Sequence, residues 1–152
     1  YYKSEGIIKE NKMSPTNYSH NWKTNKVNKK MNLVFKNNKL FSLRQKPEEK
    51  ESLRINLYDI KNAKDPLTSF LQIILGEKKS LVLDGRRTYT MNAVVDKESK
   101  SVIVEISNYL NLWADHKRNK FEKLTFEQGS LGSLPPKISI YFDGRVFRLV
   151  EN

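Results

Sequence analysis

Clusters of lysine and arginine are the most chemically suggestive feature of this sequence. One cluster lies near the N-terminus behind a tryptophan, and two shorter clusters lie further along the chain. Basic side chains neutralise phosphates and aromatic rings stack on bases, so this combination is typical of nucleic-acid binding. The candidate nucleic-acid-binding residues are Trp22, Lys23, Lys26, Lys29, Lys30, Arg86, Arg87, Lys117, Arg118 and Lys120.

A histidine in the last of these clusters is a candidate catalytic group. His116 follows an aspartate and precedes Lys117 and Arg118. A metal-independent ribonuclease needs a proton shuttle and a cation beside the transition-state phosphate, and His116 would be that shuttle. A solvated basic segment with one incidental histidine explains the same residues more simply. We therefore expect a protein without catalytic activity and keep His116 as the alternative.

Composition argues against several kinds of site. The chain has no cysteine, which rules out disulfides, thiolate metal sites, iron–sulfur clusters and cysteine nucleophiles. It has only two histidines, and its carboxylates form no D-x-D pair on a predicted strand, so we expect no metal site. Residues 129–133 lack the lysine and the spacing of a nucleotide-binding loop. We expect no cofactor.

The positive charge is concentrated in the first third of the chain. The formal net charge is +11. Residues 1–50 hold twelve basic and four acidic residues, whereas the remaining residues hold sixteen and thirteen. A localised positive field attracts polyanions such as nucleic acid, an anionic membrane or an acidic protein. Lysine and asparagine also increase together in A/T-rich genomes, so codon bias is a second explanation for the charge.

These observations favour a non-enzymatic protein that binds RNA or DNA through a lysine-rich arm and basic turns. The first alternative is a protein-interaction or assembly subunit of a larger complex, such as a ribonucleoprotein, with an acidic protein as partner. The second alternative is a small metal-independent ribonuclease or toxin that uses His116. No apolar run reaches the roughly 18–20 residues that cross a bilayer, so we expect no transmembrane segment. No signal-peptide pattern opens the chain, which predicts an intracellular protein in the cytoplasm, nucleoid or nucleus.

The elements that position these residues begin with an arm. Residues 1–30 are rich in asparagine, lysine and serine and show no sustained hydrophobic period. Such a stretch buries too little apolar surface to offset its ordering entropy, which predicts a basic, weakly structured N-terminal arm. Residues 31–152 are then a single α+β domain. No internal repeat is visible, and the oligomeric state stays open.

The best helix prediction covers residues 66–75. Asp65 precedes it as a capping residue, and Pro66 suits the first helical position. Apolar residues then recur at helical spacing and form one stripe, which leaves Thr68, Ser69 and Gln72 on the opposite, exposed face. A partial helical period over residues 111–122 indicates a possible second helix, with a short strand near residues 124–126 as the alternative.

Alternating apolar residues predict the strands. A hairpin is expected around Asn37 and Asn38, with a loop longer than two residues because a tight turn would oppose Lys36 and Lys39. A strand is expected over residues 52–60.

A meander is expected over residues 79–109, and a final hairpin turns at Asp143 and Gly144. The predicted fold class is therefore α+β: a mostly antiparallel sheet of about six to eight strands built from hairpins, with one clear helix.

Overall fold

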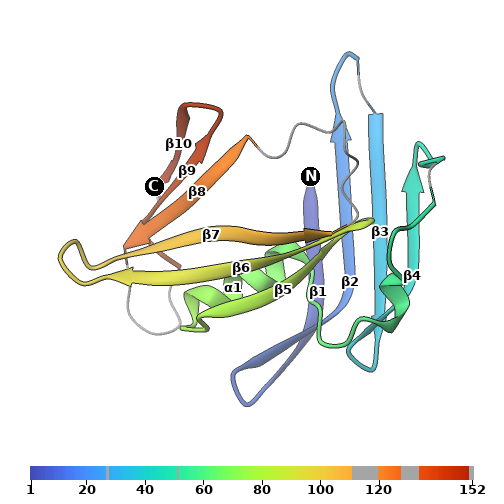
Figure 1. Ribbon diagram of the computed structural model, residues 1–152, viewed down its shortest axis with the longest axis horizontal. Coiled ribbons are helices and arrows are strands. Elements are labelled where there is room, and N and C mark those ends of the chain that lie inside the picture. The colour runs from blue at the N-terminus through green and yellow to red at the C-terminus, as the bar shows by residue number, and fades with distance from the viewer. Residues whose placement is uncertain (27, 51, 111–119, 128–133, 151–152) are drawn as a thin grey trace.

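The computed structural model describes residues 1–26, 28–50, 52–110, 120–127 and 134–150. Within them the chain forms two antiparallel sheets and one α-helix (Figure 1). The first sheet has the order β1 (Tyr2–Lys9), β2 (Lys12–Lys23), β3 (Asn28–Lys36) and β4 (Lys39–Lys46). The second sheet has the order β10 (Arg145–Val150), β9 (Lys137–Phe142), β8 (Phe121–Glu127), β7 (Ser101–Leu110), β6 (Arg87–Asp96) and β5 (Lys79–Asp84). A 3₁₀ turn, η1 (Leu57–Asp59), and helix α1 (Pro66–Ile74) connect the sheets.

The α+β class and the dominance of antiparallel hairpins are confirmed, but the strands divide between two sheets instead of forming one. The expectation of a weakly structured arm was wrong. Most of residues 1–30 form β1, β2 and the start of β3, and Tyr18 lies in the core with 1% of its surface exposed. The segment is polar because only one face of each strand is covered and the other faces water, so it shows too few apolar residues to predict strands.

Helix α1 lies between the sheets and explains how they are held together. Asp65 caps it as predicted, since its Oδ1 accepts from the backbone N–H groups of Leu67 and Thr68. The expectation that Thr68, Ser69 and Gln72 are exposed was wrong, because all three side chains are buried. The helix packs apolar residues on the second sheet and turns this polar face toward β1, β2 and β5.

The buried polar face of α1 is satisfied by hydrogen bonds that the sequence pattern does not show. Ser4 Oγ donates to Asp65 Oδ2 at 2.8 Å. Gln72 Oε1 accepts from the Met13 N–H at 2.7 Å, and Gln72 Nε2 donates to the Asn11 carbonyl at 2.9 Å. Ser80 of β5 also donates to Ser69 at 3.0 Å. Buried polar groups need such partners, so α1 tolerates a polar face because the β1–β2 hairpin and β5 supply them.

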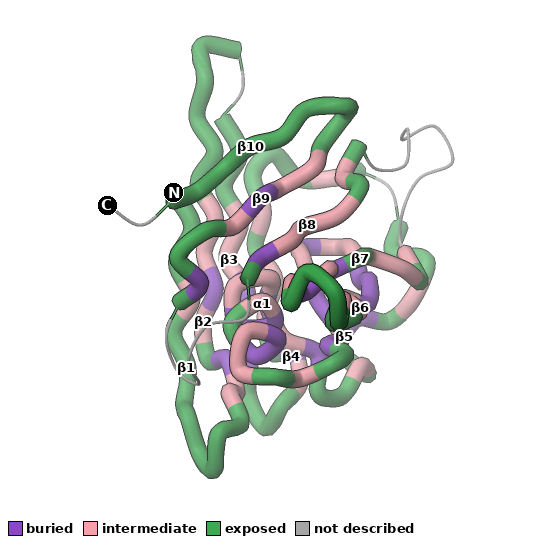
Figure 2. Tube along the Cα trace, turned by 90° about the vertical axis from the view of Figure 1, so that its left-hand side faces the viewer, coloured by how far each residue is buried: buried purple, intermediate pink, exposed green. Residues whose placement is uncertain are grey.

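Two apolar clusters form the core on either side of α1. The first is centred on Tyr18, Leu33 and Leu57 and joins the inner face of the first sheet to η1 and β5. The second joins α1 to β7 and β8. Figure 2 shows the buried residues gathered around α1 and between the sheets, whereas β10 is exposed along its length.

Residues 52–60 do not form the predicted strand. Asn56 caps η1 instead, since its Oδ1 accepts from the Tyr58 N–H and its Nδ2 donates to Asp59. Such local side-chain bonds stabilise a turn in place of a strand ladder. Ile55, Leu57 and Ile60 still pack on the first cluster, whereas Leu53 is exposed, so the pattern identified some core residues and not their conformation.

The predicted hairpins are confirmed, with one correction to a loop. The meander of residues 79–109 forms β5, β6 and β7, and the final hairpin pairs Ile140 with Phe147 as expected. The β3–β4 loop has only two residues, so Lys36 and Lys39 do lie opposite each other. Both side chains can diverge at the end of the sheet, and Lys36 Nζ lies 3.7 Å from the centre of the Phe41 ring.

Most of the second helix predicted at 111–122 falls outside the described residues, and its last residues, from Phe121, begin β8. Within the described part of the chain, the single α-helix is too short to cross a bilayer.

Candidate nucleic-acid interface

Strands β2 and β3 extend beyond their neighbours and form a basic ribbon. The pairing of the edge strands ends at Asn21 of β2 and Lys30 of β3: Tyr1, just before β1, pairs with Asn21, and Lys46 of β4 pairs with Lys30. Beyond this point β2 and β3 pair only with each other, and Trp22 lies opposite Lys29. We call the described residues 22–26 and 28–29 the ribbon; it projects from one end of the first sheet (Figure 1). Its lysines, Lys23, Lys26 and Lys29, are exposed.

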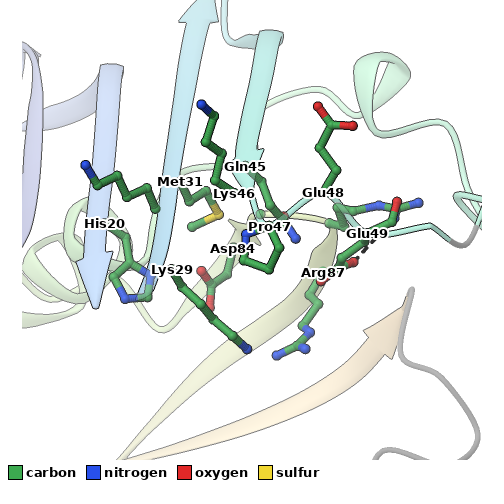
Figure 3. A pocket seen from close by; sticks show the side chains of 13 residues that line it. His20, Lys29, Met31, Gln45, Lys46, Pro47, Glu48, Glu49, Asp84 and Arg87 are labelled. Atoms are coloured by element: carbon green, nitrogen blue, oxygen red, sulfur yellow. Dashed lines mark hydrogen bonds and ion pairs between the residues drawn. The ribbon is translucent and has the colours of Figure 1, made fainter. Parts of the chain in front are cut away.

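A cleft of about 360 Å³ opens at the base of the ribbon, where the β5–β6 turn approaches the first sheet (Figure 3). We call it the basic cleft. Its cations come from two segments that are far apart in the sequence, the β3–β4 hairpin and the β5–β6 turn with the first residue of β6. The charged residues and the histidine that line it are His20, Lys29, Lys30, Lys46, Glu48, Glu49, Asp84, Arg86 and Arg87.

The lysines of the basic cleft are close because of strand pairing. Lys30 and Lys46 occupy directly opposed positions on β3 and β4. Like charges at such positions repel and destabilise a sheet. Among the described residues, neither lysine has an ion pair or a hydrogen bond to an acidic group, and both are exposed. An anion between them would relieve this repulsion.

The β5–β6 turn brings the arginines to the cleft. Asp84 and Arg87 are the last opposed pair, so Gly85 and Arg86 occupy the two central positions of the turn. Gly85 has a φ of +64°, and a Cβ placed on it would lie 2.5 Å from the Met31 sulfur. The absence of a side chain therefore allows the turn to pack against the inner face of the first sheet.

The two arginines have different surroundings. The Arg86 guanidinium lies 3.4 Å from a carboxylate oxygen of Glu49 and donates to the Glu49 carbonyl at 3.2 Å. Arg86 is thus held in the wall of the cleft. Arg87 lies opposite Asp84, and its charge lowers the pKa of that carboxyl. Burial has the larger effect and raises the pKa of Asp84 above its ordinary value.

Three carboxylates line the basic cleft beside five lysines and arginines. Glu49 is paired with Arg86, and Figure 3 shows Asp84 between His20 and Arg87. Lys29, Lys30 and Lys46 have no ion pair with a described residue. With five cations against three carboxylates, the lining keeps a net positive charge that attracts an anion.

An aromatic run lines the inner face of the first sheet beside the cleft. The Tyr2 and His20 rings are stacked with centroids 4.3 Å apart, and Trp22 meets His20 edge to face at 6.5 Å. Tyr2 and Trp22 remain 47% and 49% exposed. Burial lowers the pKa of His20, although the nearby Asp84 charge opposes this shift. The buried His20 Nε2 has no hydrogen-bond partner in the described part of the chain.

A second concavity of about 360 Å³ adjoins the basic cleft and shares Lys30 and Lys46 with it. Arg44 and the asparagines Asn21 and Asn32 add polar groups there. Most of its residues alternate with the inward-facing ones on the same strands, so this second concavity lies on the outer face of the first sheet.

The structure brings together four of the predicted residues at the cleft: Lys29, Lys30, Arg86 and Arg87. Trp22, Lys23 and Lys26 lie on the adjoining ribbon. Lys120 lies elsewhere and forms an ion pair with Asp143 at 2.6 Å. His116, Lys117 and Arg118 fall outside the described residues, so the ribonuclease hypothesis stays a sequence prediction.

Sequence reasoning missed Lys46 and His20. A two-residue loop at Asn37 and Asn38 would place Lys30 opposite Gln45. The register shifts by one residue near Phe41, and this bulge brings Lys46 opposite Lys30 instead. No local signal in the sequence marks that bulge.

Across the ranges that the structure describes, no three histidine, aspartate or glutamate side chains are grouped to hold a metal ion. Comparisons of the chain with protein-family models, with curated proteins and with solved structures found no match.

Proposed function

We propose that this protein binds nucleic acid through the basic cleft and the adjoining ribbon. The observation that carries the proposal is the position of Lys29 and Arg87 in one cleft beside exposed aromatic rings, with Lys30 and Lys46 at the rim of that cleft. Phosphates neutralise closely spaced lysines, and bases stack on aromatic side chains.

The placement of charge favours this function over codon bias alone. Codon bias adds lysines without regard to position, whereas Lys30 and Lys46 are opposed on neighbouring strands and lack acidic partners among the described residues. Such an arrangement costs stability in the free protein. A bound polyanion offsets that repulsion, because it adds an attraction to each lysine.

The test is binding of a labelled oligonucleotide, measured by fluorescence anisotropy at several salt concentrations. The cleft variant carries Lys29→Ala, Lys30→Ala and Lys46→Ala. We expect roughly ten- to hundredfold weaker binding and a salt slope reduced by about 2, since three phosphate contacts are lost. All three lysines are exposed and the substitutions remove the repulsion between Lys30 and Lys46, so the melting temperature should not fall.

A matched control removes the same charge elsewhere through Lys9→Ala, Lys97→Ala and Lys137→Ala, which are also exposed. We expect at most a threefold loss in this variant. Equal losses in the two variants would show that net charge alone drives binding and would contradict a specific cleft. Wild-type binding that does not change between 50 mM and 500 mM salt would contradict the proposal altogether.

The alternative of an assembly subunit has one observation of its own. Strand β10 is an edge of the second sheet, and its apolar side chains are exposed, Phe147 at 53% and Leu149 at 56%. Exposed apolar edges pair with other chains. The assembly function predicts a mass above 17.8 kDa by light scattering at 500 mM salt, returned to 17.8 kDa by Phe147→Glu.

A further inference from the structure

We infer that the ligand of this site is a single strand, with one phosphate in the basic cleft and an unstacked base on Trp22. This inference rests on the proposed function and adds that the nucleic acid is single-stranded and that Trp22 stacks on one of its bases. The argument depends on how the aromatic run and the lysines are spaced along the same strands.

The first argument is the exposure of Trp22. Its ring is anchored on one side by His20, which is itself stacked on Tyr2. About half of the Trp22 surface nevertheless remains open, on a ribbon that projects from the sheet. An aromatic ring that is anchored and half exposed offers a rigid platform for another flat ring.

The second argument is that Trp22 is the member of the aromatic run with an open ring. The His20 ring is already stacked on Tyr2 and meets Trp22, so a base would stack on Trp22. Stacking on a side chain requires a base that has left its neighbours, whereas a duplex offers its bases only as edges in the grooves.

The third argument is the continuity between the platform and the cleft. Lys29 lies directly opposite Trp22 on the neighbouring strand and also lines the basic cleft. Opposed side chains start about 4.5–5.5 Å apart. A base on Trp22 would thus have its phosphate close to Lys29, and Arg87 of the same cleft lies beyond it, whereas Lys30 and Lys46 alternate with Lys29 and lie on the opposite face of the sheet.

The fourth argument is the size of the basic cleft. A hollow of about 360 Å³ has the volume of a small-molecule site, and it lies as an open cleft between a turn and a sheet. A duplex would instead have to receive the ribbon in its major groove, in which case Lys23 and Lys26 would make the contacts and the cleft would stay empty. The aromatic run has no role in that arrangement.

The experiment compares three ligands of equal length: a thymidine 12-mer, the same strand with abasic sites in place of every base, and a 12-base-pair duplex. Wild-type protein should bind the thymidine strand roughly 5- to 100-fold more tightly than the abasic strand, because one base stacks on Trp22. It should also prefer the thymidine strand to the duplex.

Three substitutions of Trp22 separate stacking from simple packing. Trp22→Phe keeps an aromatic face and should keep most of the preference for bases over abasic sites. Trp22→Leu keeps apolar bulk without a π face and should remove that preference, as should Trp22→Ala. Because Trp22 is half exposed, all three variants should remain folded, which a thermal melt would verify.

The outcomes distinguish this inference from the proposed function. Equal binding of the thymidine and abasic strands, or duplex binding as tight as single-strand binding, overturns the inference and leaves nucleic-acid binding intact. A polyglutamate chain of equal charge that competes as well as the thymidine strand overturns both and indicates an acidic protein partner.

Discussion

The tripeptide Asp-Gly-Arg occurs twice in this chain and forms a hairpin turn each time, but with different residues at the turn. In residues 143–145, Asp143 and Gly144 are the central pair and both have positive φ, +54° and +71°. In residues 84–86, the central pair is Gly85 and Arg86, one residue later. The shift moves Asp84 from the turn onto the strand, where it faces the basic cleft.

The surroundings of the two turns explain the difference. The β9–β10 turn is exposed, and its side-chain partners lie at or just before the start of the neighbouring strand β8: Lys120 pairs with Asp143, and the Gly144 N–H donates to Glu122 at 2.7 Å. The β5–β6 turn packs on Met31, and Arg86 is held by Glu49. Intrinsic turn preference decides the first turn, whereas packing against another sheet decides the second.

The largest expected effect on stability comes from replacing the glycine of each turn by alanine. Gly85→Ala adds a Cβ that collides with the Met31 sulfur at a positive φ, and it should lower the free energy of unfolding by about 2–3 kcal/mol. Gly144→Ala meets nothing within 4 Å and should cost about 1 kcal/mol from φ alone. Urea denaturation of both variants measures the difference.

A second glycine experiment tests the assigned cause. In a Met31→Ala background the collision is absent, so the additional cost of Gly85→Ala should fall to about that of Gly144→Ala. An unchanged cost in that background would show that packing on Met31 does not set the turn.

Replacing the arginine of each turn should change stability by less than replacing the glycine does. Arg86→Ala removes an ion pair and a hydrogen bond from a side chain that is 14% exposed, which should cost about 1 kcal/mol. Arg145→Ala removes an exposed side chain and should stay within about 0.5 kcal/mol of wild type. Thermal unfolding of the two variants measures this, and equal losses would contradict the structural role of Arg86.

The smallest effect concerns the pH dependence of stability. Burial raises the pKa of Asp84 above 3.8, so the folded protein holds this proton more tightly than the unfolded chain does. Stability from this group therefore decreases as pH rises from about 4 through the raised pKa. Asp84→Asn should flatten that decrease in melts between pH 4 and 7. A steeper decrease in the variant would contradict the assigned burial.

Asp143→Asn provides the control for the pH experiment. It removes an exposed ion pair with Lys120, in which both side chains are about half exposed. Such pairs contribute about 0–1 kcal/mol, so this variant should follow wild type closely over the same pH range.

Parts of the fold were predictable because their causes are local. The α1 cap depends on Asp65 and the two residues that follow, and the β9–β10 turn depends on Asp143 and Gly144. The N-terminal strands were not predictable, since they are held by pairing and by the burial of residues such as Tyr18. Their polar sequence resembles a disordered segment when it is read without its neighbours.

The candidate site also combines residues that the sequence could predict with an arrangement that it could not. Lys29, Lys30, Arg86 and Arg87 were identified from the sequence as cations beside aromatic or turn residues. Their meeting around one cleft, and the addition of Lys46, depend on a bulge in β4 and on the packing of the β5–β6 turn. Neither feature has a local signature.

The sequence by itself determined the α+β class, the capped helix, the hairpins and the concentration of positive charge. These follow from local propensity, hydrophobic period and composition, which act over a few residues. Only the tertiary structure decided that the basic N-terminal strands form a sheet, that α1 buries a polar face, and that lysines and arginines from distant strands line one cleft. Those outcomes depend on strand register and on packing between sheets, where residues far apart in the chain supply each other's partners.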